Sequence, residues 1–117
     1  MTVFKLGELF CGPGGIAYGA THATIDNKDF KIVHEWANDY DANTCETYRY
    51  NIARHNPDSV ICGDVRELDI ESLSPINALA FGFPCNDFSV VGEQKGFEGD
   101  FGPLYTYGVR ALMIFLL

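Results

Sequence analysis

The sequence has few basic residues. Its 117 residues include 8 lysines and arginines against 16 aspartates and glutamates, for a formal net charge of −8 at pH 7. Binding to the phosphates of nucleic acids needs clustered lysine and arginine. We therefore expect this chain alone to bind duplex DNA weakly or not at all at physiological salt. Any function on DNA would take most of its positive charge from elsewhere.

Membrane spans, export signals and metal sites are also missing from the pattern. No apolar run is long enough to span a bilayer, and the start of the chain lacks the architecture of a signal peptide. Cys11, Cys45, Cys62 and Cys85 are widely spaced, without the spacing of a zinc site. We expect one small domain in a reduced, cytoplasmic setting, with no metal and no membrane partner.

Short apolar runs alternate with amphipathic segments along the whole chain. This alternation predicts an α/β fold with a parallel sheet, whose ligands bind beyond the carboxyl ends of the strands. We expect strands at 3–10, 31–38, 59–62 and 76–81, and helices at 16–20, 42–53, 66–73 and 104–117.

Two of the predicted helices have an expected core face. In the segment 42–53, Asp41 is expected to be the N-cap, and Cys45, Tyr48 and Ile52 form the apolar face. Cys45 is therefore assigned a structural role. In the segment 104–117, the expected apolar face is formed by Tyr105, Leu112 and Phe115.

The first predicted strand ends in a glycine turn, Cys11-Gly12-Pro13-Gly14-Gly15. Glycines allow a tight turn and close approach of the backbone to a ligand. The spacing differs from the GxGxxG of dinucleotide sites, which favours a cofactor without a pyrophosphate. A turn with a purely structural role is the alternative.

The second and third predicted strands end in acidic residues. Asp39 follows the second strand, where a carboxylate can accept hydrogen bonds from ribose hydroxyls, and Tyr40 could stack on an adenine. Asp64 follows the third strand with Val65 beside it, and could accept a hydrogen bond from an adenine amino group. The structural alternatives are a helix cap for Asp39 and a turn aspartate for Asp64.

The fourth predicted strand leads into Gly82-Phe83-Pro84-Cys85-Asn86-Asp87-Phe88-Ser89. A thiol at a strand end, held by a proline and followed by a glycine-punctuated polar loop, has the position of a nucleophile. A buried core cysteine is an equal alternative on position alone.

Together these motifs closely resemble the N-terminal part of the cytosine-C5 DNA methyltransferases. Leu9–Gly15 is similar to the first motif of that family, Asn38–Asp41 to the second and Gly63–Val65 to the third, and Gly82–Ser89 resembles the catalytic motif. Segments 92–97 and 102–105 are similar to the loop and helix that follow. Asn86 departs from the family, which usually has glutamine there.

The resemblance implies a Rossmann-like methyltransferase fold, S-adenosylmethionine as cofactor and a flipped cytosine in duplex DNA as substrate, as in restriction–modification systems. It implies that Cys85, as a thiolate, adds to C6 of the cytosine. The cofactor residues that it implies are Phe10, Gly12, Gly14, Gly15, Asp39, Tyr40, Asp64, Val65, Pro84 and Leu104. The implied DNA contacts are Ser89, Gln94 and Lys95.

The later parts of that family, including its Glu-Asn-Val and Gln-x-Arg-x-Arg motifs and its target-recognition domain, have no counterpart in the sequence. We expect residues 1–117 to be the N-terminal part of a catalytic domain, inactive alone and completed by a polypeptide that carries those motifs. The apolar end, Ala111–Leu117, would be buried in that partner. Two alternatives stay open: a truncated remnant that at most binds cofactor, and a Rossmann-like oxidoreductase with a redox cysteine.

Overall fold

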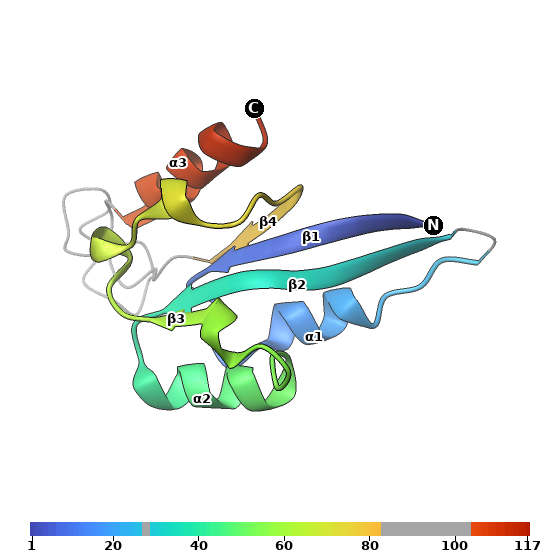
Figure 1. Ribbon diagram of the computed structural model, residues 1–117, viewed down its shortest axis with the longest axis horizontal. Helices are drawn as coiled ribbons and strands as arrows, with labels where there is room; N and C mark the ends of the chain where they lie inside the picture. Colours follow the sequence, from blue (N-terminus) through green and yellow to red (C-terminus); the bar gives the residue numbers. More distant parts are fainter. Residues whose placement is uncertain (27–28, 83–103) are drawn as a thin grey trace, which may run out of the picture.

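The structure is a computed structural model that describes residues 1–26, 29–82 and 104–117. Its centre is a four-stranded sheet in the order β3-β2-β1-β4, with every neighbouring pair parallel (Figure 1). The strands are β1 (Thr2–Leu9), β2 (Phe30–Asp39), β3 (Val60–Cys62) and β4 (Ala78–Phe81). The prediction of an α/β fold with a Rossmann-like parallel sheet is confirmed.

Helices cover both faces of this sheet. The helices α1 (Gly15–Thr21) and α2 (Ala42–Asn51) lie on one face, and α3 (Tyr105–Phe115) lies on the other (Figure 1). The core is correspondingly divided in two. The α1/α2 side includes Leu6, Ala17, Ala37, Cys45 and Tyr48. The α3 side includes Leu9, Trp36, Ile70, Ile76 and Ala111.

Gly7 explains an irregularity in the pairing of β1 with β2. The register shifts between Leu6 and Gly7. A Cβ atom on Gly7 would lie 2.6 Å from Cζ2 of Trp36, so the tryptophan ring occupies the space that a side chain would need. The indole N–H of Trp36 donates to the carbonyl of Ser74 at 2.9 Å, which fixes the ring over the strand.

The helix α2 begins as the sequence predicts. Asp41 is its N-cap, and the carboxylate accepts a hydrogen bond from the backbone N–H of Thr44 at 2.8 Å. Cys45 and Tyr48 are fully buried, and Ile52 packs beside them. Arg49 then ties the end of the helix to β3, because its Nη2 donates to the carbonyl of Val60 at 2.7 Å.

The predicted helix over 66–73 is wrong. Two short 3₁₀ turns occupy this region, Val65–Glu67 and Ile70–Ser72. The backbone becomes extended at Leu68, so helical hydrogen bonding cannot continue between the two turns. Each turn instead buries one aliphatic side chain, Val65 or Ile70, against the α3 side of the sheet.

The predicted apolar face of the last helix is confirmed at Phe115, which packs against the core, and wrong at Leu112. Leu112 is 36% exposed, whereas Gly108 and Ala111 are the buried residues of α3. The ring of Phe81 on β4 occupies the space directly above Gly108. Because glycine has no side chain, the face of α3 that carries Gly108 is the one that can approach the sheet. Among the described residues, no helix is long and apolar enough to cross a membrane.

We predict that Gly108→Ala destabilises the protein by about 1–3 kcal/mol, the cost of overpacking a core contact. The added methyl group would overlap the Phe81 ring. The matched control is Gly19→Ala in α1, where a Cβ would meet no atom within 4 Å. Because alanine favours a helix over glycine, the control should gain about 0.5–1 kcal/mol. Urea unfolding of both variants measures the difference, and equal effects would contradict this packing.

Candidate functional site

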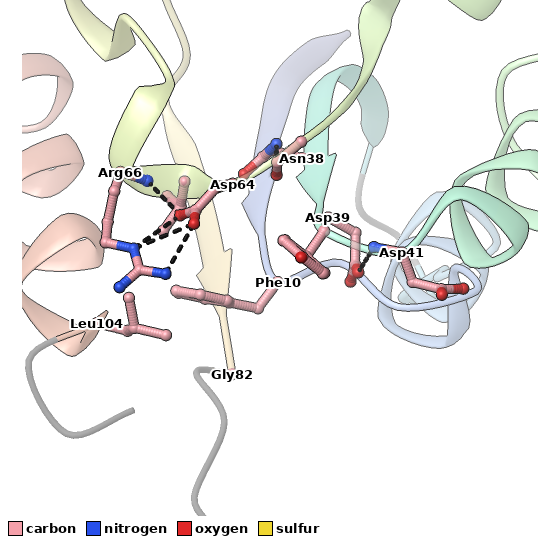
Figure 2. Close-up of a pocket in the computed structure, with 11 residues that line it drawn as sticks. Phe10, Asn38, Asp39, Asp41, Asp64, Arg66, Gly82 and Leu104 are labelled. Atoms are coloured by element: carbon pink, nitrogen blue, oxygen red, sulfur yellow. Dashed lines mark hydrogen bonds and ion pairs between the residues drawn. The ribbon is translucent and has the colours of Figure 1, made fainter. Parts of the chain in front are cut away.

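A pocket of about 710 Å³ lies beyond the carboxyl ends of the strands. Residues that end or directly follow all four strands contribute to it, and α3 adds the residue that precedes it, Leu104 (Figure 2). The lining residues are Phe10, Asn38, Asp39, Tyr40, Asp41, Gly63, Asp64, Val65, Arg66, Gly82 and Leu104. This edge of a parallel sheet is where α/β proteins bind their ligands.

The turn after β1 is fastened to the end of β2. The backbone N–H of Gly12 donates to Oδ2 of Asp39 at 2.9 Å, and the N–H of Cys11 donates to the carbonyl of Asn38 at 3.1 Å. The turn depends on the left-handed region of backbone conformation, with φ of 56° at Phe10 and 60° at Gly12. This shape directs the Phe10 ring into the pocket (Figure 2).

Asp39 is held in position by two backbone donors. Beside the bond from Gly12, its Oδ1 accepts a hydrogen bond from the N–H of Asp41 at 3.1 Å. A carboxylate has about four acceptor sites, so acceptor capacity remains for a ligand. Tyr40 follows at the rim of the pocket, 77% exposed, with its ring accessible for stacking.

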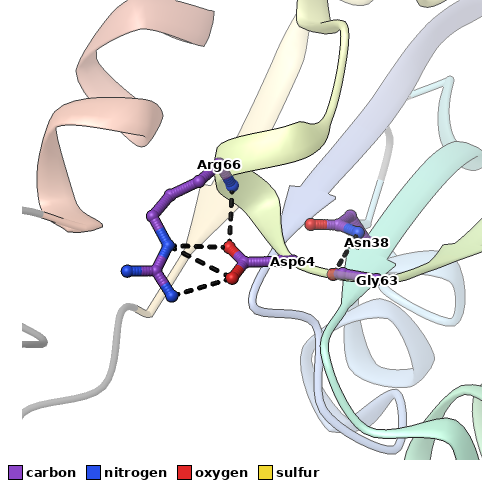
Figure 3. A network of polar contacts seen from close by, with 4 residues as sticks. All are labelled: Asn38, Gly63, Asp64 and Arg66. Atoms are coloured by element: carbon purple, nitrogen blue, oxygen red, sulfur yellow. Dashed lines mark hydrogen bonds and ion pairs between the residues drawn. The ribbon is translucent and has the colours of Figure 1, made fainter.

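Asp64 lies across the pocket from Asp39 (Figure 2), and its carboxylate forms a fork with Arg66 (Figure 3). Its Oδ1 accepts from the backbone N–H of Arg66 at 2.9 Å and from Nε at 3.0 Å, and its Oδ2 accepts from Nη2 at 2.8 Å. The hydrogen bonds from the Arg66 side chain and then from its backbone hold the pKa of Asp64 below its usual range. The carboxylate is therefore ionised at neutral pH.

Asn38 braces the strand end that carries Asp64. This amide is 2% exposed, and its Nδ2 donates to the carbonyls of Ile61 at 2.7 Å and Gly63 at 3.1 Å (Figure 3). The bond to Gly63 lies directly before Asp64 in the chain. A polar side chain buried near the end of β2 thus fixes the end of β3.

The structure brings together many of the residues that the sequence singles out. Those that line the pocket are Phe10, Asp39, Tyr40, Asp64, Val65 and Leu104. Gly12, Gly14 and Gly15 form the turn behind the pocket and do not line it; a Cβ on Gly14 would lie 3.0 Å from Cγ1 of Ile52 on the α2 side. The remaining predicted site residues, Pro84, Cys85, Ser89, Gln94 and Lys95, lie outside the described residues.

For two lining residues the sequence predicts no role. In the structure Asn38 braces the end of β3, and Arg66 is the hydrogen-bond partner of Asp64. Each left a signal. Asn38 is the last residue of a predicted strand, directly before Asp39, and Arg66 follows an acidic residue by two positions.

The buried thiols on the α1/α2 side do not suit nucleophilic chemistry. Burial, followed by the negative charge of Asp39, raises the pKa of Cys11 far above the ordinary range. Burial, followed by a hydrogen bond with Cys62, raises the pKa of Cys45 to about 12. Both thiols are protonated at neutral pH, and a thiol attacks as its thiolate. Within the described ranges, no cluster of three or more His, Cys, Asp or Glu residues could hold a metal ion.

Comparison with known proteins covers almost the whole chain. A family model described as C-5 cytosine-specific DNA methylase matches residues 4–115. The chain is 57% identical to the type II methyltransferase M.BbvI of Brevibacillus brevis, in an alignment that covers 93% of this chain and 31% of that protein. It is 36% identical to the type II methyltransferase M.Bsp6I of Bacillus sp. (strain RFL6), over 95% of this chain and 32% of that protein.

The chain therefore spans about a third of the length of these relatives. The family match extends over the glycine turn, all four strands, the pocket and α3. The chain belongs to the C-5 cytosine-specific DNA methylase family.

Proposed function

We propose that this chain supplies the cofactor site and the attacking cysteine of an enzyme that methylates C5 of cytosine in DNA with S-adenosylmethionine. The observation that carries the proposal is the convergence of Phe10, Asp39, Tyr40, Asp64 and Val65 on one pocket. They come from three separate strand ends. Membership of the family supports the reaction class.

The pocket suits S-adenosylmethionine in size and in chemistry. Its volume lies within the range of about 300–1,000 Å³ that is usual for small-molecule sites. Phe10 and Tyr40 offer aromatic faces to an adenine, and Asp39 and Asp64 offer carboxylate oxygens to hydroxyl and amino groups. When bound, this cofactor would supply an electrophilic methyl group.

Cys85 is the proposed nucleophile. Gly82, three residues before it, and Leu104, the next described residue after it, both line the proposed cofactor site. We propose that the Cys85 thiolate adds to C6 of the cytosine, which makes C5 nucleophilic toward the methyl group. Loss of the C5 proton and departure of the thiolate then restore the aromatic ring.

The remaining requirements fall to a polypeptide that carries the later family motifs. These requirements are an acid at N3 of the cytosine, a means to hold the flipped base and the positive charge that DNA binding needs. Ser89, Gln94 and Lys95 are the proposed DNA contacts of this chain. On α3, Met113 and the residues around it are exposed and apolar, and we propose that they contact that polypeptide.

An oxidoreductase that binds a dinucleotide is the competing class. The spacing Gly12-x-Gly14-Gly15 lacks the GxGxxG of pyrophosphate sites, and the family match counts against this class.

We predict that Asp39→Ala weakens binding of S-adenosylmethionine by about 1.5–3 kcal/mol, the scale of hydrogen bonds to a charged group. Isothermal titration calorimetry on the full chain measures the effect. Asp58→Ala is the matched control, because Asp58 is exposed and does not line the pocket. Binding of NAD in place of S-adenosylmethionine would refute the proposed cofactor.

We also predict that Cys85→Ser abolishes methyl transfer by the enzyme assembled with the later motifs, since a serine hydroxyl is scarcely ionised at neutral pH. Cys45→Ser is the matched control, and it should reduce stability while leaving the chemistry intact, because Cys45 is buried and does not line the pocket. Duplex DNA that contains 5-fluorocytosine should trap the enzyme covalently through Cys85, because fluorine blocks proton loss from C5. Mass spectrometry identifies the attached residue, and attachment through another residue would disprove the mechanism.

A further inference from the structure

A chain of hydrogen-bond contacts crosses the α1/α2 side of the sheet and ends at Glu8. Oγ of Ser59 donates to the carbonyl of Asn56 at 2.7 Å and lies 2.7 Å from Nε2 of His34. Nδ1 of His34 lies 3.1 Å from the hydroxyl oxygen of Tyr48. That oxygen lies 2.8 Å from Oε1 of Glu8. The four contacts connect the 3₁₀ turn before β3 (Pro57–Ser59), the strand β2, the helix α2 and the strand β1.

Glu8, at the inner end of this series of hydrogen-bond contacts, is buried among apolar groups. Glu8 is 1% exposed, and its partners in the neighbouring strands are Ala37 and Ala80. The titratable group that acts on its pKa is Tyr48 from α2, and Glu8 in turn acts on the pKa of the Cys11 thiol, after β1.

The other elements around Glu8 add little charge. His34 of β2 reaches it only through Tyr48. On α1 the titratable residue is Tyr18, which is exposed, and β4 has only apolar side chains. Asp39, at the end of β2, acts on Cys11.

The number of hydrogens available for these four contacts depends on the protonation of Glu8 and His34. Each of the four contacts needs one hydrogen, and a backbone carbonyl can only accept. With Glu8 ionised and His34 neutral, Ser59, His34 and Tyr48 bring one hydrogen each. Burial raises the pKa of Tyr48, so its hydroxyl keeps that hydrogen. Because three hydrogens cannot fill four contacts, one contact would have no hydrogen. In that contact two lone pairs would face each other at hydrogen-bond distance.

We propose that Glu8 is a neutral carboxylic acid in the folded protein and supplies the missing hydrogen to Tyr48. Tyr48 then donates to Nδ1 of His34, Nε2–H of His34 donates to Ser59, and Ser59 donates to Asn56. Every contact now holds one hydrogen. The result is a proton-dependent brace between α2 and β1, two residues before Phe10 enters the pocket.

A single extra proton could also be placed on His34, which would pair an imidazolium with an ionised Glu8. Burial opposes this arrangement at both ends. It raises the pKa of Glu8, against a smaller lowering by the hydrogen bond from Tyr48, and it lowers the pKa of His34. Both directions favour the neutral pair.

The pH dependence of stability follows from this assignment. The pKa of Glu8 is about 4.3 in the unfolded chain and higher in the folded protein. The stability that the protonated group contributes is therefore complete below about pH 4.3 and is lost as the pH rises through the folded-state pKa. This inference does not depend on the proposed cofactor or reaction.

The direct test is carbon-13 NMR of the full chain with labelled glutamate carboxyl groups, in which Glu8→Gln identifies the Glu8 signal. At about pH 6, well above the ordinary glutamate pKa of about 4.3, the Glu8 signal should have the position of a protonated acid. Nitrogen-15 spectra should show His34 neutral with its hydrogen on Nε2. An ionised Glu8 at that pH, or an imidazolium at His34, would overturn the proposal.

Unfolding measured against pH gives an independent test. In Glu8→Gln an amide N–H replaces the acid O–H, so the variant should lose the part of the pH dependence that wild type shows above about pH 4.3. Tyr48→Phe is the matched comparison. It removes the hydroxyl that links Glu8 to His34 but retains Glu8, and it should be less stable than wild type at every pH. Identical pH dependence in wild type and Glu8→Gln would overturn the proposal.

Discussion

The hydrogen bond from the Gly12 backbone to the Asp39 carboxylate is the interaction on which the site depends. It joins the turn after β1 to the end of β2. The carbonyl of the same aspartate accepts the N–H of Gly63 at 2.9 Å, which joins β2 to the end of β3. One residue therefore fixes three strand ends around the pocket. A parallel sheet brings these ends to one edge, and Asp39 sets their spacing there.

The charge of the chain suits the proposed cofactor site and does not suit a phosphate backbone. Acidic side chains face the pocket, and Arg66 is the positively charged side chain in its lining. The chain as a whole carries a net charge of −8. Such a surface suits the hydroxyl and amino groups of a nucleoside cofactor far better than a phosphate backbone.

Local patterns in the sequence predict the strands, α2 with its Asp41 cap and the strand ends that carry Asp39 and Asp64, because each depends on neighbouring residues. Two features that the sequence does not predict depend on contacts between distant segments. The face of α3 is set by Phe81 fitting over Gly108, and no periodicity within 104–117 contains that information. The contact between Glu8 and Tyr48 joins residues forty positions apart, so no local pattern in the sequence indicates it.

The proposed function requires that the pocket at the carboxyl edge of the sheet binds the adenosyl cofactor. Backbone amide NMR of the full chain, titrated with S-adenosylhomocysteine, tests it most directly, because that product binds the same site without transferring a methyl group. We expect the largest shifts at Gly12, Tyr40, Asp64 and Val65, with the outer surface of α2 unaffected. Shifts confined to residues away from the pocket, or no shifts at a saturating concentration, would contradict it.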